Sequence, residues 1–192
     1  MMWITLGIIA ILALGIYIFI SQPRFGSIPR GERLEQVNNS PHYSNGKFQN
    51  LHETKQITSD KGFWGSLVDF LFKKHERVRP ESNIPSIQTD LWKLDRREDL
   101  LVWFGHSSYL LQVDGKRILV DPVLKGAGSP VSFINKPFPG TEVYQPEDIP
   151  EIDYLVISHD HWDHLDYGTI KAIRQRVGKV VCGLGTGQHF ER

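Results

Sequence analysis

A cluster of ligand-type side chains at residues 159–164 constrains this chain more than any other feature of its sequence. An apolar stretch at 152–157, with the length and composition of a buried strand, comes directly before it. A helix is predicted over 167–177, with Asp166 as its N-cap and Gly178 as its end. The cluster therefore lies in a turn from a strand into a helix, which indicates an α/β fold. Its members are His159, His161, Asp163 and His164.

The chemistry of these side chains points to a metal site. Imidazole and carboxylate groups suit Zn²⁺ and similar divalent ions. In an extended chain His159 and His161 point to the same side and can share one metal. Asp163 and His164 follow the turn and can reach a second metal or hold a bridging water. Two neighbouring metal ions lower the pKa of such a water, and Asp163 can accept its proton, which makes Asp163 the catalytic candidate. The alternative, a polar loop with chance histidines, fits this spacing poorly.

Strand patterns surround the cluster. Asp114-Gly115 between two β-rich runs predicts a tight hairpin, because that turn needs positive φ angles. Residues 124–150 are rich in proline and are predicted to form a long loop, which is usually functional or disordered. The predicted strands cover residues 100–104, 109–113, 118–120, 152–157 and 179–182.

The N-terminus carries an apolar run without charged residues at 3–20. Its length suffices to cross the hydrocarbon core as a helix. A cleaved signal peptide would show basic residues before the run and a small-residue cleavage site after it, and neither is present. The sequence therefore predicts an uncleaved transmembrane anchor over 1–21. The positive-inside rule places the globular part in the cytoplasm, because basic residues follow the run at Arg24, Arg30 and Arg33.

Residues 22–98 are predicted to be a lead-in between this anchor and a globular domain at 99–192. Residues 21–60 are polar, contain turn signals and show no apolar periodicity, so we expect them to be irregular. Residues 62–75 differ, because aromatic and aliphatic side chains share one helical face and basic residues follow. Such an amphipathic helix can lie in a membrane interface or pack on the domain, and the apolar stripe serves both.

Charge and cysteine content exclude some classes of protein. Lys and Arg total 22 and Asp and Glu total 22, which argues against a general nucleic-acid binder. The single cysteine, Cys182, cannot form an internal disulfide. It follows β-type residues, and we expect it to be a buried apolar side chain.

The segment from Asp153 to His164 resembles the metal signature of the metallo-β-lactamase superfamily. One branch of that superfamily contains N-acyl-phosphatidylethanolamine-hydrolysing phospholipase D and related bacterial membrane proteins. The likeness covers roughly residues 38 to 192. The pieces similar to that branch are residues 38–43, 46–50, 103–108, 121–123 and 129–130.

The resemblance implies an αββα sandwich, of which residues 99–192 would form the first half. It implies that His159 and His161 bind the first of two Zn²⁺ ions, and that Asp163 and His164 bind the second. The family's further ligands are another His, a bridging Asp and a final His. His189 does not match them, so they would lie beyond residue 192, and the chain is expected to be an incomplete enzyme by itself.

Two more residues are candidates for supporting roles. His106 lies among small residues in a bend between strands; it either supports the site or is a structural histidine, which the sequence favours. Asp121 either orients the ligands or caps the turn before Pro122.

The leading functional hypothesis is zinc-dependent hydrolysis of a phosphodiester or other ester, in a membrane lipid, by a metal-activated water. One alternative is a lactonase or other hydrolase of a soluble substrate on the same fold. Another is a non-catalytic, membrane-bound metal or lipid binder. The expected partners are a lipid bilayer and the ester or phosphodiester substrate, without nucleic acid. The oligomeric state does not follow from the sequence.

Overall fold

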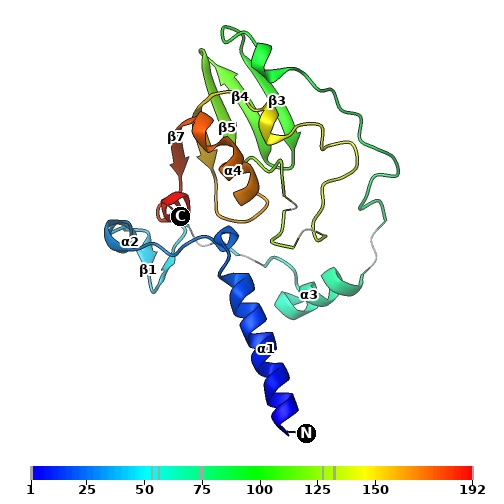
Figure 1. The fold of residues 1–192 in the computed structure, drawn as a ribbon, viewed down its shortest axis with the longest axis vertical. Helices are drawn as coiled ribbons and strands as arrows, with labels where there is room; N and C mark the ends of the chain where they lie inside the picture. The colour runs from blue at the N-terminus through cyan, green and yellow to red at the C-terminus, as the bar shows by residue number, and fades with distance from the viewer. Residues whose placement is uncertain are drawn as a thin grey trace.

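Five strands form one mixed sheet in the computed structural model, which describes residues 2–52, 54–55, 57–73, 76–126, 128–131 and 133–191 (Figure 1). The strand order across the sheet is β3-β4-β5-β6-β7. The strands are β3 Leu100–Gly105, β4 Ser108–Val113, β5 Lys116–Val120, β6 Ile152–Ile157 and β7 Val177–Cys182. Each of them contains a run predicted from the sequence, so the predicted α/β class is confirmed.

The first three strands are antiparallel neighbours joined by tight turns. Asp114 and Gly115, with φ angles of 48° and 71°, connect β4 to β5, as the hairpin signal predicted. The last three strands are parallel. Because β4 runs opposite to β5, the β3–β4 turn lies at the same edge of the sheet as the C-terminal ends of β5 and β6. This edge carries the candidate site.

Helix α4 (Tyr167–Ile173) makes the crossover from β6 to β7. Asp166 caps it, because its carboxylate accepts hydrogen bonds from the backbone N–H groups of Gly168 and Thr169, at 3.1 and 3.0 Å. The connection from β5 to β6 is the predicted long loop, with a short 3₁₀ turn at Pro146–Asp148. Buried side chains from the sheet, α4, this loop and the turn before β3 form one core; the most enclosed include Leu91, Leu110, Leu119, Ile149, Leu155 and Ile173.

The predicted end of α4 at Gly178 is wrong. The helix ends at Ile173, a 3₁₀ turn covers Arg174–Arg176, and Gly178 lies inside β7. A Cβ atom at position 178 would lie 3.0 Å from the carbonyl oxygen of Asp153 on β6. The glycine thus permits close approach of two strands instead of ending a helix.

The lead-in is more ordered than predicted. It contains a 3₁₀ turn at Pro23–Phe25 and helix α2 at Gly31–Asn38. It also contains a hairpin of β1 (Tyr43–Ser44) and β2 (Lys47–Phe48). The prediction of irregular structure over 21–60 is therefore wrong. Helix α2 buries a single hydrophobic side chain, Val37, so it has no apolar periodicity to read from the sequence.

Two apolar helices stand apart from the core. Helix α1 (Met2–Ile20) is long and apolar enough to cross a membrane, and it projects from the globular part (Figure 1). Helix α3 (Gly62–Phe72) lies within the predicted 62–75 and buries none of its residues. The last two residues of the predicted helix, Lys74 and His75, lie outside the described residues. A further 3₁₀ turn, η2 (Leu91–Lys93), precedes β3.

One carboxylate secures the edge of the sheet farthest from the candidate site. Asp153 on β6 accepts hydrogen bonds from the backbone N–H of Arg117 and from the Arg96 guanidinium, both at 2.9 Å. The Lys116 ammonium lies 3.4 Å from its other oxygen. The Arg117 N–H, followed by the two cations, holds the pKa of Asp153 below its usual value, against the opposing effect of burial. Asp153 therefore stabilises the fold in its charged form.

We expect Asp153→Asn to lower the free energy of unfolding by about 1–3 kcal/mol at neutral pH, as for loss of hydrogen bonds to a charged group. A depressed pKa contributes stability above the unfolded-state value of about 3.9, and this contribution is lost as the pH falls through the folded-state value. The difference in the free energy of unfolding between wild type and variant should thus become smaller below about pH 4. Denaturant unfolding of the full chain in detergent measures both effects, with the exposed Asp60→Asn as control. If this difference in unfolding free energy stays constant with pH, Asp153 does not stabilise the fold through its charge.

Candidate metal centre

The candidate ligands lie in the segment that leaves β6, which we call the metal-ligand loop (residues 158–165). The loop closes on itself, because the carbonyl oxygen of His161 accepts hydrogen bonds from the N–H groups of His164 and Leu165, at 3.0 and 2.7 Å. This turn gathers the imidazoles. The ring centroids of His159 and His161 are 4.6 Å apart, and those of His159 and His164 are 3.9 Å apart. The structure thus brings together the three histidines that the sequence selected.

Asp163 completes this group and brings in a residue from another element. Its Oδ2 atom lies 3.2 Å from Nε2 of His106 and 3.8 Å from Nε2 of His164. One ligand atom from each of these three residues lies within 4.8 Å of the others, which is close enough to hold a metal ion. Of the predicted ligands, Asp163 and His164 therefore share one space with His106, whereas His159 and His161 lie outside this three-residue group.

His106 lies in the β3–β4 turn, with a φ angle of 43°. Its carbonyl oxygen accepts a hydrogen bond from the indole N–H of Trp103 at 3.0 Å. The side chain is 60% exposed and is directed at Asp163. This placement favours a role at the metal site over the structural role that its small neighbours suggested.

A buried carboxylate lies behind the imidazoles. Asp121, which is 2% exposed, accepts hydrogen bonds from the backbone N–H and the hydroxyl of Ser158, at 2.8 and 2.6 Å. Its Oδ2 atom is also 2.8 Å from Nδ1 of His164. The Ser158 hydroxyl lies 3.0 Å from Nδ1 of His159. Each Nδ1 atom thus has an oxygen partner, which leaves Nε2 of both rings available as a ligand.

The donor set fits a divalent metal. Imidazoles suit zinc, iron, copper and nickel, and a buried carboxylate that orients a ligating imidazole is the usual support for such a ligand. His159, His161, His164 and Asp163 would hold the metal, with His106 beside them and Asp121 in support. Sequence reasoning missed the ligand-like position of His106 and the connecting role of Ser158. The signal for His106 was the antiparallel hairpin, which returns residue 106 to the edge of the sheet where β6 ends.

A cavity of about 430 Å³ adjoins this cluster. The β3–β4 turn and the long loop before β6 form its walls. Its lining combines apolar and aromatic surface with one ammonium, a composition typical of small-molecule sites. The residues that define it include Trp103, Phe104, His106, Lys136, Phe138 and Asp163.

Residues 100–188 match the model of the β-lactamase superfamily domain. The match spans the five-stranded sheet, α4 and the metal-ligand loop. The family resemblance read from residues 153–164 is thereby confirmed.

Several known proteins are similar to this chain. An uncharacterised protein of Mycobacterium tuberculosis is 36% identical over 153 residues, which are 79% of this chain and 41% of that protein. The N-acyl-phosphatidylethanolamine-hydrolyzing phospholipase D 1 of Caenorhabditis elegans is 38% identical over 76 residues, 37% of this chain and 20% of that enzyme. A metal-dependent hydrolase of Aeropyrum pernix is 38% identical over 73 residues, 38% of this chain and 25% of its own length.

Among solved structures, the diiron β-hydroxylase CmlA of Streptomyces venezuelae is 39% identical over a match that covers 43% of this chain and 15% of that chain, with a TM-score of 0.33. The chain spans about two fifths of the length of the mycobacterial relative. The proteins similar in sequence that are named for a reaction include hydrolases and a hydroxylase of Streptomyces venezuelae, so the family match leaves the substrate open.

We expect Asp121→Asn to weaken metal retention by about 10- to 100-fold, because loss of a carboxylate behind a ligating imidazole typically has that effect. The amide matches the carboxylate in size, so the change is in charge and in hydrogen-bonding capacity. Competition with a chromophoric chelator on the full chain in detergent measures the change. Asp60→Asn, an exposed carboxylate remote from the site, is the matched control. If Asp121→Asn retains metal within about twofold of wild type, Asp121 does not support the metal ligands.

Proposed function

We propose that the protein is a metal-dependent hydrolase, with zinc as the preferred metal, that cleaves a phosphodiester or ester bond with an activated water. The observation that carries this proposal is the cluster of His106, Asp163 and His164 beside a cavity. The His159 ring packs against His164, and the His161 ring packs against His159. The match to the β-lactamase superfamily domain and the similarity to two hydrolases support the proposal.

The roles of the chain's own groups follow from their positions. Bound divalent ions would supply an acidified water and positive charge for the oxygens of the scissile bond. Asp163 accepts the proton of the attacking water, and the imidazole of His106, whose Nε2 lies 3.2 Å from Oδ2 of Asp163, restricts the orientation of that carboxylate. Asp121 holds the His164 ring in place. The Lys136 ammonium, on the cavity wall, suits the negative charge of a phosphodiester.

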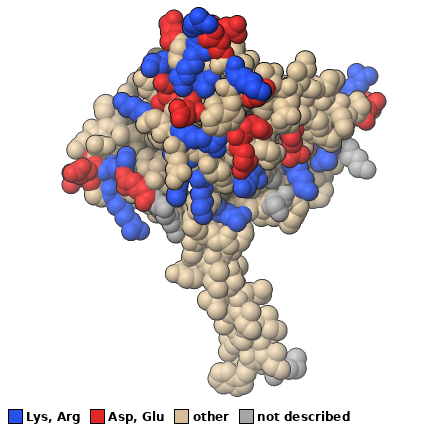
Figure 2. Space-filling view, turned by 45° about the horizontal axis from the view of Figure 1, so that its top comes forward, with Lys and Arg blue, Asp and Glu red and all other residues tan. Residues whose placement is uncertain are grey.

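Two features of the structure favour a substrate in a membrane. Helix α1 projects as a stalk without charged side chains, whereas the charged groups cover the globular part (Figure 2). Helix α3 lies at the level of the C-terminal end of α1 along the long axis of the molecule (Figure 1). Its large hydrophobic side chains are exposed, among them Trp64 at 74% and Phe70 at 82%. A bilayer that α1 spans would meet α3 at its interface, where aromatic side chains are favoured.

In this proposal α1 is a single-pass anchor, and the globular part lies on one side of the membrane. Arg24, Arg30 and Arg33 follow α1, and the positive-inside rule makes that side the cytoplasm. This membrane placement separates the lipid hypothesis from hydrolysis of a soluble ester such as a lactone, which needs neither α1 nor α3.

We expect the full-length protein, loaded with zinc in nanodiscs, to cleave a phospholipid-type phosphodiester. Asp163→Asn should lower turnover by at least about 100-fold, the usual contribution of a general base, while Asp60→Asn leaves turnover unchanged. Phosphodiester lipids, a soluble phosphodiester and a lactone are assayed in parallel. Turnover of the lactone alone would replace the lipid hypothesis with the soluble-substrate alternative. Metal retention with no turnover of any ester would make the protein a binder.

The position of α3 has its own test in proteoliposomes with brominated acyl chains. Trp64→Phe should remove more of the tryptophan quenching than Trp92→Phe does, because Trp64 lies in the interface. Trp3 on α1 stays quenched in both variants. Trp92→Phe is the matched control: Trp92 is 52% exposed, but η2 lies at the end of the molecule remote from α1 (Figure 1). Equal loss of quenching in the two variants, or none in either, would place α3 outside the membrane.

A further inference from the structure

The apex of the metal-ligand loop contacts the chain segment that follows α1, which we call the juxtamembrane segment (residues 23–30). The indole N–H of Trp162 donates a hydrogen bond to the carbonyl oxygen of Arg24 at 3.2 Å. The Trp162 ring also meets the Phe25 ring edge to face, with centroids 5.7 Å apart and planes at 82°. Trp162 stands between His161 and Asp163, so a displacement of its backbone moves two candidate ligands.

The juxtamembrane segment is joined firmly to the end of α1. The N–H groups of Phe25 and Gly26 donate to the carbonyl oxygens of Gln22 and Pro23, at 3.0 and 2.9 Å. The Phe25 ring packs edge to face on Phe19, in the last turn of α1, with centroids 5.1 Å apart. Phe25 therefore lies between the apolar helix and the metal-ligand loop and contacts both.

A second contact reaches the loop on its other flank. The N–H of Ser27 donates to Nδ1 of His189 at 2.9 Å, and Nε2 of His189 lies 3.4 Å from the Asp160 carboxylate. Gly26 makes this approach possible: its φ angle is 69°, and a Cβ atom there would overlap the His189 imidazole. The glycine is thus required both for the backbone conformation and for the contact.

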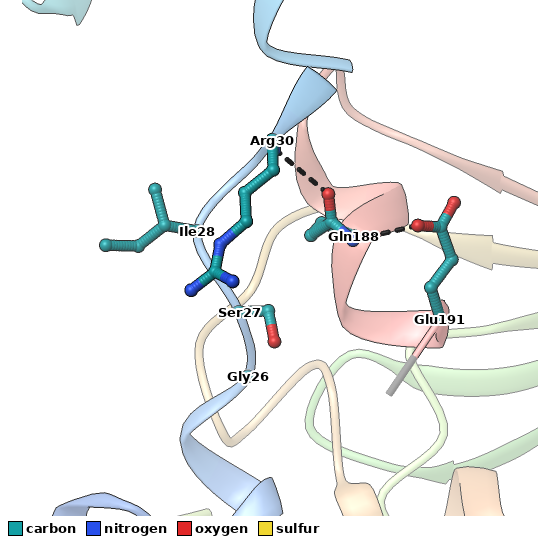
Figure 3. Close-up of a pocket in the computed structure, with 6 residues that line it drawn as sticks. All are labelled: Gly26, Ser27, Ile28, Arg30, Gln188 and Glu191. Carbon is teal, nitrogen blue, oxygen red and sulfur yellow. Dashed lines mark hydrogen bonds between the residues drawn. The ribbon is translucent and has the colours of Figure 1, made fainter. Parts of the chain in front are cut away.

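The juxtamembrane segment also contacts the 3₁₀ helix near the C-terminus and the long loop between β5 and β6. Figure 3 shows residues 26–30 running beside the 3₁₀ helix η5 (Thr186–Glu191), where the Arg30 N–H donates to the Gln188 side chain at 3.0 Å. The Arg24 guanidinium donates to the carbonyl oxygen of Pro130, 3.1 Å away, in the long loop between β5 and β6. One short segment therefore binds three parts of the chain that surround the candidate metal site.

We propose that Trp162 and Phe25 are positioning residues, through which the juxtamembrane segment fixes the metal-ligand loop relative to the bilayer. The contact serves two purposes. It holds His161 and Asp163 in position relative to the other candidate ligands. It also fixes the distance between the site and the end of α1. The metal part of this inference rests on the proposed function; the contact between loop and segment does not.

The test is a double-mutant cycle on the full chain in nanodiscs. Trp162→Ala and Phe25→Ala should each weaken zinc retention by about tenfold, as loss of support behind ligands does. The double variant should also lose about tenfold and not a hundredfold, because both changes break one contact. Trp162→Phe keeps a ring against Phe25 and should restore most of the retention. Trp92→Phe, which removes another indole donor, remote from the site, is the control.

Hydrogen exchange without added metal gives the second readout. Both alanine variants should lose protection at residues 160–165 and 24–27 together, with the sheet β3–β6 unchanged. Additive losses in zinc retention, or exchange at the loop equal to wild type, would overturn the proposal. If wild type itself retains no metal, the proposed function fails, and the exchange data alone decide whether the contact positions the loop. A variant that loses protection across the sheet is unfolded, and Trp162→Phe then supplies the decisive comparison.

Discussion

The parallel pairing of β5 with β6 is the constraint on which the candidate site depends. Val120 pairs with Val156, so the residues that follow each strand emerge side by side at one edge. Asp121 and Ser158 meet there, and the Asp121 carboxylate accepts hydrogen bonds from the backbone N–H and the hydroxyl of Ser158. A carboxylate that is 2% exposed requires such partners, because burial of an unpaired charge is very costly. The sheet thus fixes a buried carboxylate, and this carboxylate fixes the His164 ring, whose Nδ1 atom faces it.

The parts that follow from local sequence are those whose cause is local. Asp114-Gly115 predicts its hairpin because only a positive φ angle closes that turn, and Asp166 predicts the start of α4 because its carboxylate satisfies free N–H groups. The metal-ligand cluster is recognisable because its residues are neighbours in sequence. His106 is not, because its approach to Asp163 depends on a strand order that no short stretch encodes. The same holds for Ser158, whose hydroxyl has a meaning only once Asp121 lies beside it.

The polar contacts of the lead-in could not be predicted from hydropathy or periodicity. A division into anchor, lead-in and domain rests on hydropathy and periodicity, which report burial of apolar side chains. The contacts that join residues 23–38 to the domain are of another kind: a carbonyl oxygen to an indole, an N–H to an imidazole, and the Arg33–Glu191 ion pair at 2.7 Å. An exposed ion pair contributes little by itself. Here it adds to several hydrogen bonds along one segment, so the lead-in and the domain act as one unit around the metal-ligand loop.

Backbone strain points to the same edge of the sheet. His106 and Asp121 both adopt positive φ angles, 43° and 42°, although neither is glycine. Such residues cost about 1 kcal/mol or more each and persist where surrounding contacts over-determine them. At Asp121 these contacts are visible: its N–H donates to the Val156 carbonyl at 3.0 Å, and its carbonyl accepts from the Ser108 hydroxyl at 2.6 Å. The two residues thus keep an unfavourable backbone conformation in which the Asp121 side chain reaches His164 and the His106 side chain reaches Asp163.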